Sequence, residues 1–236
     1  MSQDRAAAPR LDVVIPALDA ASYLGATLAS LAPGQARGLV REIILVDGGS
    51  TDGTCTVAAA GGARVLRSDA GRGRQLRAGG AAAQAPWVLF LHADTRLEAR
   101  WVEEAAAFID AAGEGGARAA VFRLRFDDAA LAARLLERIV ILRTRALGLP
   151  YGDQGLLISR ALYRQVGGFA DMPLMEDVDM VRRLGRRRLV LLRIQATTSA
   201  ERYRRAGYLA RSLKNLSILL LYYLGVAPER LARLYG

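Results

Sequence analysis

Short apolar runs alternate with longer helical segments along the first half of the chain. Three largely apolar runs end in polar or turn-forming residues, at about 11–15, 42–46 and 87–91, and are typical of strands buried on both faces. Residues 63–66 are expected to form a further strand. The segments between and after them have helical spacing or composition, near 20–31, 53–60, 71–84 and 98–112. This alternation predicts a doubly wound, mostly parallel sheet covered by helices. Asp19 is placed to cap the first helix, and Pro33-Gly34 to end it.

The pattern changes after a glycine-rich turn at 113–116, and the second half predicts a mixed sheet. We expect strands at 119–126, 156–158 and 189–194, and helices at 129–147, 160–166 and 176–185. No repeat or linker interrupts the sequence, so we expect one domain over 1–236. Within it, a nucleotide-binding half would cover about 11–112 and an acceptor half about 117–200.

The C-terminal segment predicts an amphipathic helix over about 203–225. Its apolar residues recur at three- and four-residue steps, at Ala206, Leu209, Leu213, Leu216, Leu220 and Leu224. The apolar side chains of such a stripe have to be covered by another surface that shields them from water. Three covers stay open at this point: the rest of the domain, a second copy in a homodimer, or an anionic membrane surface.

Positive charge is concentrated in the same quarter of the chain. From Arg182 to the end there are 13 Lys+Arg and two acids, whereas the other 181 residues hold 20 Lys+Arg and 21 acids. Such an excess favours an anionic partner. Nucleic acid is disfavoured, because the segment lacks interleaved exposed aromatic residues. Each basic residue near an anionic bilayer contributes about 1 kcal/mol, which favours the membrane among the possible covers.

The N-terminus and the cysteine content bear on location. The first ten residues, MSQDRAAAPR, have no apolar core and do not form a signal peptide. Cys55 is the only cysteine, which excludes an internal disulfide and a cysteine-based zinc cluster; we expect it to be a small buried residue. We therefore expect a cytoplasmic protein, which the basic C-terminal segment could hold at the inner face of the membrane.

Candidate chemistry lies at the ends of the apolar runs. His92 and Asp94 follow the run at 87–91, where ligands of parallel sheets bind. In an extended backbone both would point to one side and could bind a divalent cation. The alternative is a satisfied histidine and the N-cap of the following helix.

Three further segments carry polar or charged candidates. The glycine-rich loop 47–54 could approach a nucleotide, although an ordinary turn with a helix N-cap is the better explanation of the loop taken alone. Arg72 and Arg74 stand at a predicted helix start, where guanidinium and free N–H groups bind anions. Glu176 and Asp177 could act as general base or could simply cap a helix.

Five segments in order carry a family resemblance: VVIPALDA, ILVDGGSTDGT, SDAGRGRQLRAG, FLHADT and a downstream ED. Together they resemble the family-2 glycosyltransferases of GT-A fold, over roughly residues 11–195. GRGRQ and FLHADT look most like a small bacterial subgroup associated with radical SAM and selenium-domain proteins. The resemblance implies a GT-A-type, Rossmann-like mixed sheet, mostly parallel and flanked by helices, here with the C-terminal amphipathic helix added.

The resemblance also implies roles for individual residues. Pro16 and Ala17 would line the nucleotide base, Asp47 would bind its edge, and Asp52 would support the loop. Arg72 and Arg74 would lie near the diphosphate. Asp94 would bind Mn²⁺ or Mg²⁺, with His92 as an accessory ligand in place of the family's usual first Asp. Asp177, with Glu176 beside it, would be the catalytic base. Asp153 and Gln154 would approach the donor sugar or acceptor. Arg77 stands where the family commonly has Asn.

The expected reaction is inverting, metal-dependent transfer of a sugar from a nucleotide diphosphate sugar, with a UDP-sugar favoured. The acceptor is not identified by the sequence and could be lipid-linked. Two alternatives stay open. A nucleotidyltransferase of similar fold would release pyrophosphate instead of a nucleoside diphosphate. A non-enzymatic basic protein that binds a membrane surface would turn over no nucleotide sugar.

Overall fold

A computed structural model describes residues 10–113 and 116–235. One sheet has the strand order β3-β2-β1-β4-β7-β6-β8-β5. Its strands are β1 (Leu11–Ala17), β2 (Val40–Asp47), β3 (Arg64–Arg67), β4 (Trp87–Phe90), β5 (Thr95–Leu97), β6 (Ala119–Phe126), β7 (Leu156–Ser159) and β8 (Leu189–Thr198). The α-helices are α1 (Ala21–Ala36), α2 (Thr54–Ala60), α3 (Arg72–Ala82), α4 (Trp101–Ala112), α5 (Leu131–Leu147), α6 (Arg160–Gln165), α7 (Glu176–Leu184), α8 (Glu201–Ala206), α9 (Tyr208–Tyr223) and α10 (Pro228–Tyr235). Two short 3-10 helices are η1 (Gly152–Gln154) and η2 (Arg186–Arg188).

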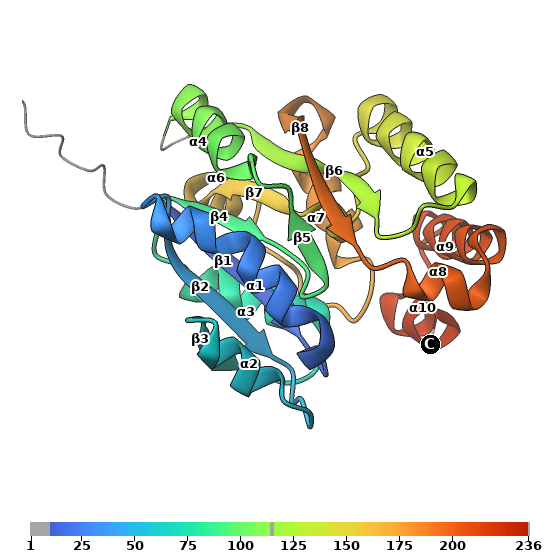
Figure 1. Cartoon of the computed structure of the whole chain (residues 1–236). Coiled ribbons are helices and arrows are strands. Elements are labelled where there is room, and N and C mark those ends of the chain that lie inside the picture. The colour runs from blue at the N-terminus through green and yellow to red at the C-terminus, as the bar shows by residue number, and fades with distance from the viewer. Residues whose placement is uncertain (1–9, 114–115, 236) are drawn as a thin grey trace, which may run out of the picture.

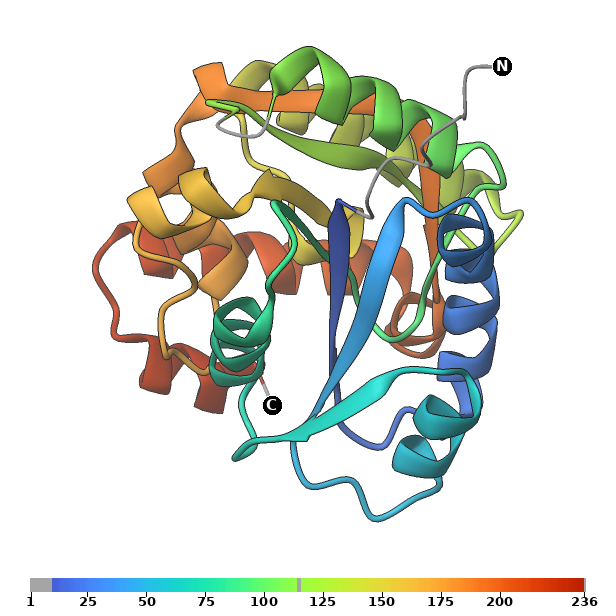
Figure 2. The same cartoon turned by 90° about the vertical axis from the view of Figure 1, so that its left-hand side faces the viewer.

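Helices cover both faces of the sheet (Figure 1). Successive residues of β1 point to opposite faces, so Val13 and Ile15 pack with α1, α2 and α4, whereas Val14 packs with α3. Figure 2 shows α1 and α2 on one side of β1 and β2 and α3 on the other. The mixed, helix-flanked sheet predicted from the sequence is confirmed.

The first-half strands end together at one edge of the sheet. β1 pairs in parallel with both β2 and β4, and β2 with β3. Ala17, at the end of β1, is opposite Asp47 at the end of β2. β7 and β6 then join β4 through antiparallel pairings, which place the second half of the chain in the same sheet. Polar residues after β1, β2 and β4 are therefore delivered to a common edge.

Two predictions about the first helix are wrong. α1 continues through Pro33 to Ala36 and does not end before it. Near the end of a helix a proline removes only one hydrogen bond, and Gly34 here packs closely against Trp101, which leaves no room for a side chain. Asp19 does not cap α1 either: the first N–H groups donate instead to the side chains of Asp52 and Thr54.

The segment after β4 also differs from the expectation. The strand ends at Phe90, and residues 93–94 form a turn in which Thr95 N–H donates to the His92 carbonyl. The short strand β5, which pairs with β8, follows before α4 begins at Trp101. Asp94 is therefore not the N-cap of a helix, and an extended backbone does not explain how His92 and Asp94 are oriented.

The C-terminal amphipathic helix is present but does not extend unbroken over 203–225. Gly207, with a positive φ of 81°, separates α8 from α9, and the unpredicted α10 follows. The leucines of the predicted stripe are exposed, whereas Ile218 and Leu219 on another face of α9 are buried. Within 10–113 and 116–235, no helix has the length and apolarity needed to span a bilayer.

Two predictions rest partly on residues that the structure does not describe. The N-terminal segment, which we do not expect to be a signal peptide, lies almost wholly within 1–9, outside the described residues. The glycine-rich turn at 113–116 includes the undescribed residues 114–115.

Candidate active site

A cavity of about 700 Å³ lies at the common edge described above. Seven of the residues selected from the sequence line it: Pro16, Ala17, Arg72, His92, Asp94, Asp153 and Asp177. They come from the ends of β1 and β4, the start of α3, η1 and the start of α7. The other five selected residues, Asp47, Asp52, Arg74, Gln154 and Glu176, are not part of its lining.

Asp47 and Asp52 organise the loops beside the cavity. The buried Asp47 carboxylate accepts hydrogen bonds from the backbone N–H groups of Gly49 and Ser50, at 3.2 Å each. Burial raises the pKa of Asp47, but hydrogen bonds from Ser50 and Gly49 outweigh it and hold the pKa below its usual value. Asp52 accepts from the N–H groups of Ala21 and Thr54, which ties this loop to two helix starts. Cys55 is partly exposed, so the prediction that it is buried is wrong.

Arg72 and Glu176 form an ion pair between α3 and α7. The Glu176 side chain is 1% exposed and that of Arg72 is 36% exposed. Burial lowers the pKa of Arg72, but the charges of Glu176 and Asp177 outweigh it and raise it, so the side chain is a permanent cation. Burial raises the pKa of Glu176, and its Oε2 has no partner among the described residues. Arg72 thus presents a fixed positive charge at the cavity wall.

Arg74 points elsewhere. It is exposed and pairs with Asp69 and Asp171, at 3.2 Å in each case. Gln75, one residue on, lines the cavity instead and donates to the backbone carbonyls of Ala17 and Val46. The side-chain amide of Gln75 therefore holds the ends of β1 and β2 in place beneath the cavity.

His92 and Asp94 both reach the cavity from the turn after β4. Burial, together with the charges of Arg72 and Arg202, lowers the pKa of His92 to about 3, so the imidazole is neutral. Burial raises the pKa of Asp94. Asp94 Oδ1 accepts only two long hydrogen bonds, at 3.4 Å, from the hydroxyls of Thr95 and Thr198. Lone pairs on both side chains stay available to a ligand.

This donor set fits a divalent cation that is also held by a bound ligand. In the described part of the chain, no group of three or more His, Cys, Asp or Glu side chains is arranged to hold a metal ion. A neutral imidazole and a carboxylate are nevertheless suitable ligands for Mn²⁺, and Mg²⁺ is commonly bound through one or two carboxylates plus phosphate oxygens. Asp94 and His92 could therefore hold such an ion with the oxygens of a diphosphate.

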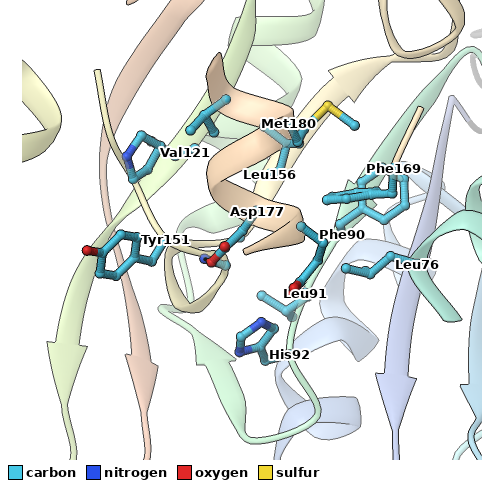
Figure 3. A pocket seen from close by; sticks show the side chains of 15 residues that line it. Leu76, Phe90, Leu91, His92, Val121, Tyr151, Leu156, Phe169, Asp177 and Met180 are labelled. Carbon is cyan, nitrogen blue, oxygen red and sulfur yellow. Dashed lines mark hydrogen bonds between the residues drawn. The ribbon is translucent and has the colours of Figure 1, made fainter. Parts of the chain in front are cut away.

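Asp177 lies at the start of α7 and faces both the large cavity and a smaller one of about 30 Å³. Its two carboxylate oxygens accept hydrogen bonds from the backbone N–H groups of Gly152, at 2.7 Å, and Val178, at 2.8 Å. Figure 3 shows its carboxylate between Tyr151 and Phe90, with His92 nearby. Asp177 is not the N-cap of α7, which is Met175, but its side chain combines anchoring of the Gly152 loop with exposure to the cavity.

Asp153 and Gln154, adjacent in the sequence, have different surroundings. Asp153 lines the cavity, its buried Oδ1 has no partner among the described residues, and burial raises its pKa to about 6, with Asp177 and Asp94 also raising it. Gln154 is fully buried, accepts from the Thr144 hydroxyl and donates to the Phe122 carbonyl. Gln154 therefore supports the loop and does not face the cavity.

The far wall of the cavity consists of residues that sequence reasoning missed. The C-terminal helices contribute Arg202, Tyr203, Arg211, Asn215 and Tyr235. Asn215 donates to the Tyr203 hydroxyl at 3.1 Å and accepts from the Tyr235 hydroxyl at 3.2 Å. Arg211 donates to Tyr235 and stacks on its ring, 4.5 Å from the centroid. Arg211 and Asn215 are four residues apart on the side of the predicted helix opposite the leucine stripe. This spacing was the one feature of the sequence that could have identified this wall.

Comparison with known proteins gives one family match. The model for glycosyl transferase family 2 matches residues 12–164. No curated protein matches the chain significantly.

Solved structures share the fold. A mycobacterial protein is 26% identical, with a TM-score of 0.55, and the match covers 81% of this chain and 66% of that one. Glucosyl-3-phosphoglycerate synthase from Mycobacterium tuberculosis, in complex with Mn²⁺ and UDP-glucose, is 23% identical, with a TM-score of 0.56 and coverage of 81% and 70%. TarS 1–349 from S. aureus is 16% identical, with a TM-score of 0.60 and coverage of 96% and 70%. The chain thus spans about two thirds of the length of these structures.

Proposed function

Since the chain belongs to glycosyltransferase family 2, we propose that it transfers a sugar from a nucleotide diphosphate sugar to an acceptor with inversion at the anomeric carbon. One observation carries the proposal: a single cavity collects a cation, two candidate metal ligands and a candidate base from three segments of the chain. These are Arg72, Asp94 with His92, and Asp177. A UDP-sugar is the favoured donor, because a structure of the same fold holds UDP-glucose and Mn²⁺.

The donor would bind at the ends of β1, β2 and β4. Pro16 and Ala17 would line the base. Asp47 would either bind the edge of the base directly or hold loop 48–50 in the shape that binds it. Arg72 would face the diphosphate, and its positive charge would stabilise the leaving group. Burial lowers the pKa of Arg72, but Glu176 and Asp177 raise it by more, so the side chain keeps this charge. Mn²⁺ or Mg²⁺, held by Asp94 and His92, would supply Lewis-acid neutralisation of the diphosphate. Arg74 would reach the diphosphate only after releasing Asp69 and Asp171.

The acceptor would enter opposite, against Tyr203, Arg211 and Asn215. Asp177 would remove the proton from an acceptor hydroxyl, which then attacks the anomeric carbon as the nucleoside diphosphate leaves. Asp153 would hold the donor sugar or the acceptor. An acceptor that is already ionised, such as a phosphate, would need no base.

The test is a binding and product assay. We expect UDP or a UDP-sugar to raise the melting temperature more than GDP or CDP does, and Mn²⁺ to increase that rise. Turnover should release a nucleoside diphosphate. Release of pyrophosphate would instead establish the nucleotidyltransferase alternative, and the absence of any nucleotide-dependent shift would overturn the proposal.

A further inference from the structure

Two helices in the C-terminal half expose rows of large apolar side chains. On α5 the exposed residues are Leu131, Leu135, Ile139, Leu142 and Leu147, and on α9 they are Leu209, Leu213, Leu216, Leu220 and Tyr223. The exposed fraction reaches 87% at Leu131 and 74% at Leu209. The α9 row and the α5 row up to Leu142 follow helical steps of three or four residues, so each helix turns one apolar face outward, and Leu147 extends the exposed apolar surface at the end of α5. Contiguous exposed apolar surface of this kind marks an interaction site.

Contacts at both ends hold α5 and α9 on the same side of the molecule. At their N-terminal ends, the Tyr208 hydroxyl donates to Asp128, at 2.8 Å. At their C-terminal ends both meet the segment 182–186: Arg182 lies over the ring of Tyr223, and Arg186 packs against Gly148. The two helices therefore run in the same direction along one side of the molecule, opposite α2 and β3 (Figure 1).

The same side is basic. α5 carries four Arg and one Glu, and that Glu137 is buried and paired with Arg125 and Arg134. Residues 201–235 carry seven Lys+Arg and two Glu, and five of the seven lie outside the cavity wall, to which Arg202 and Arg211 belong. Arg138 and Arg145 are exposed among the leucines of α5, and Arg204 and Arg205 precede α9. A second copy would bring like charges together, whereas anionic lipid headgroups would neutralise them.

We propose that the outward faces of α5 and α9 dock on the surface of an anionic lipid bilayer. We call this surface, defined by the ten apolar residues given above with Arg138 and Arg145, the docking face. Because neither helix could span a bilayer, they would lie in the interface, with leucines among the acyl chains and arginines at the headgroups. The opposite side of α9 carries Arg211 and Asn215, which line the cavity. One helix would thus separate the bilayer from the acceptor wall.

Docking requires neither donor nor turnover, so it is tested by vesicle flotation of the full-length protein. We expect binding to vesicles of phosphatidylcholine with phosphatidylglycerol at low salt, and much weaker binding at high salt or to phosphatidylcholine alone. Replacing Leu135, Leu213 and Leu216 together by Gln should lower the partition coefficient by about tenfold or more. The matched control replaces the exposed Ala59, Ala60 and Ala111 of α2 and α4 by Gln, and should change nothing.

Charge is tested separately. Arg138→Gln with Arg145→Gln should lower the partition coefficient by about tenfold and flatten its salt dependence. The control pair Arg100→Gln with Arg118→Gln, exposed but far from the docking face, removes the same net charge and should have little effect.

Three results would overturn the proposal. The first is no flotation with anionic vesicles at low salt. The second is an equal loss in the control variants. The third is a stable dimer, seen by sedimentation in the absence of lipid, that the leucine variant dissociates, which would make the docking face a subunit interface.

Discussion

The carboxylate of Asp177 accepts a hydrogen bond from the backbone N–H of Gly152, with 2.7 Å between oxygen and nitrogen. This bond fastens the start of α7 to the loop that carries Tyr151 and Asp153. The residue proposed as base is therefore also a structural anchor, and an informative substitution has to separate the two roles.

Asp177→Asn makes that separation. An amide oxygen can still accept from Gly152, but the amide cannot take a proton from the acceptor. We expect turnover to fall about 10²- to 10⁴-fold, while the donor dissociation constant changes little. Steady-state kinetics and calorimetry measure the two quantities. Asp179→Asn, on the same turn but paired with Arg183, is the matched control. Equal losses in turnover and donor binding would mean that Asp177 is only a structural anchor.

The ion pair of Arg72 and Glu176 predicts a non-additive double variant. Arg72→Met leaves the Glu176 carboxylate buried and unpaired, and should lower the free energy of unfolding by about 2–4 kcal/mol. Adding Glu176→Met removes the stranded charge and should restore most of that stability. Donor binding should stay weak in both variants, since the cation is absent from each. Restored binding in the double variant would show that Arg72 does not contact the donor.

Asp94 and His92 should differ in their effect on metal dependence. Asp94→Asn should abolish the increase in UDP affinity that Mn²⁺ produces, because it removes the anionic ligand. His92→Ala should only reduce that increase, since a neutral imidazole supplies no charge. Calorimetric titration of UDP with and without Mn²⁺ measures both, and Asp110→Asn, an exposed carboxylate of α4 outside the cavity, is the control. An unchanged Mn²⁺ effect in Asp94→Asn would contradict the assignment.

Asp153 predicts a pH-dependent stability of the ligand-free protein. Burial raises its pKa from 3.8 to about 6, so between these values the folded state binds more protons than the unfolded state. Stability should therefore fall as pH rises through this window, and the cost of the ionised carboxylate is fully present above it. Asp153→Asn should raise the free energy of unfolding by about 1–3 kcal/mol at neutral pH and by little near pH 4.

Urea unfolding at the two pH values measures this difference between wild type and variant. A difference that does not change with pH would mean that the carboxyl is not protonated in the folded protein.

Local pattern was enough to predict β1, β2, β3 and β4 and the four helices of the first half, because largely apolar runs alternate there with segments of helical spacing. It failed where packing decides. Gly34 lets α1 continue past Pro33 by its close contact with Trp101, a residue far along the chain. β5 has only three residues and depends on its pairing with β8. Neither the contact between Gly34 and Trp101 nor the pairing of β5 with β8 can be predicted from the local sequence.

The family resemblance, which the match over 12–164 confirms, led to the side of the cavity that we propose binds the donor, but not to its other wall. Arg72 and Glu176 are 104 residues apart in sequence, and their pairing follows only from the packing of α3 and α7. Tyr203 on α8 and Arg211 and Asn215 on α9 all line the cavity, from opposite sides of the helix break at Gly207. Helical periodicity had identified the outer side of α9, and its inner side became evident only in three dimensions.

The position of α9 and α10 makes the cavity a composite of two separable parts. The family match ends at residue 164, whereas Arg211, Asn215 and Tyr235 belong to the last quarter of the chain. A relative could keep the nucleotide side unchanged and still present a different wall to its second substrate by altering only 199–235. Exchanging that segment between relatives would then redirect the choice of acceptor while leaving the donor the same.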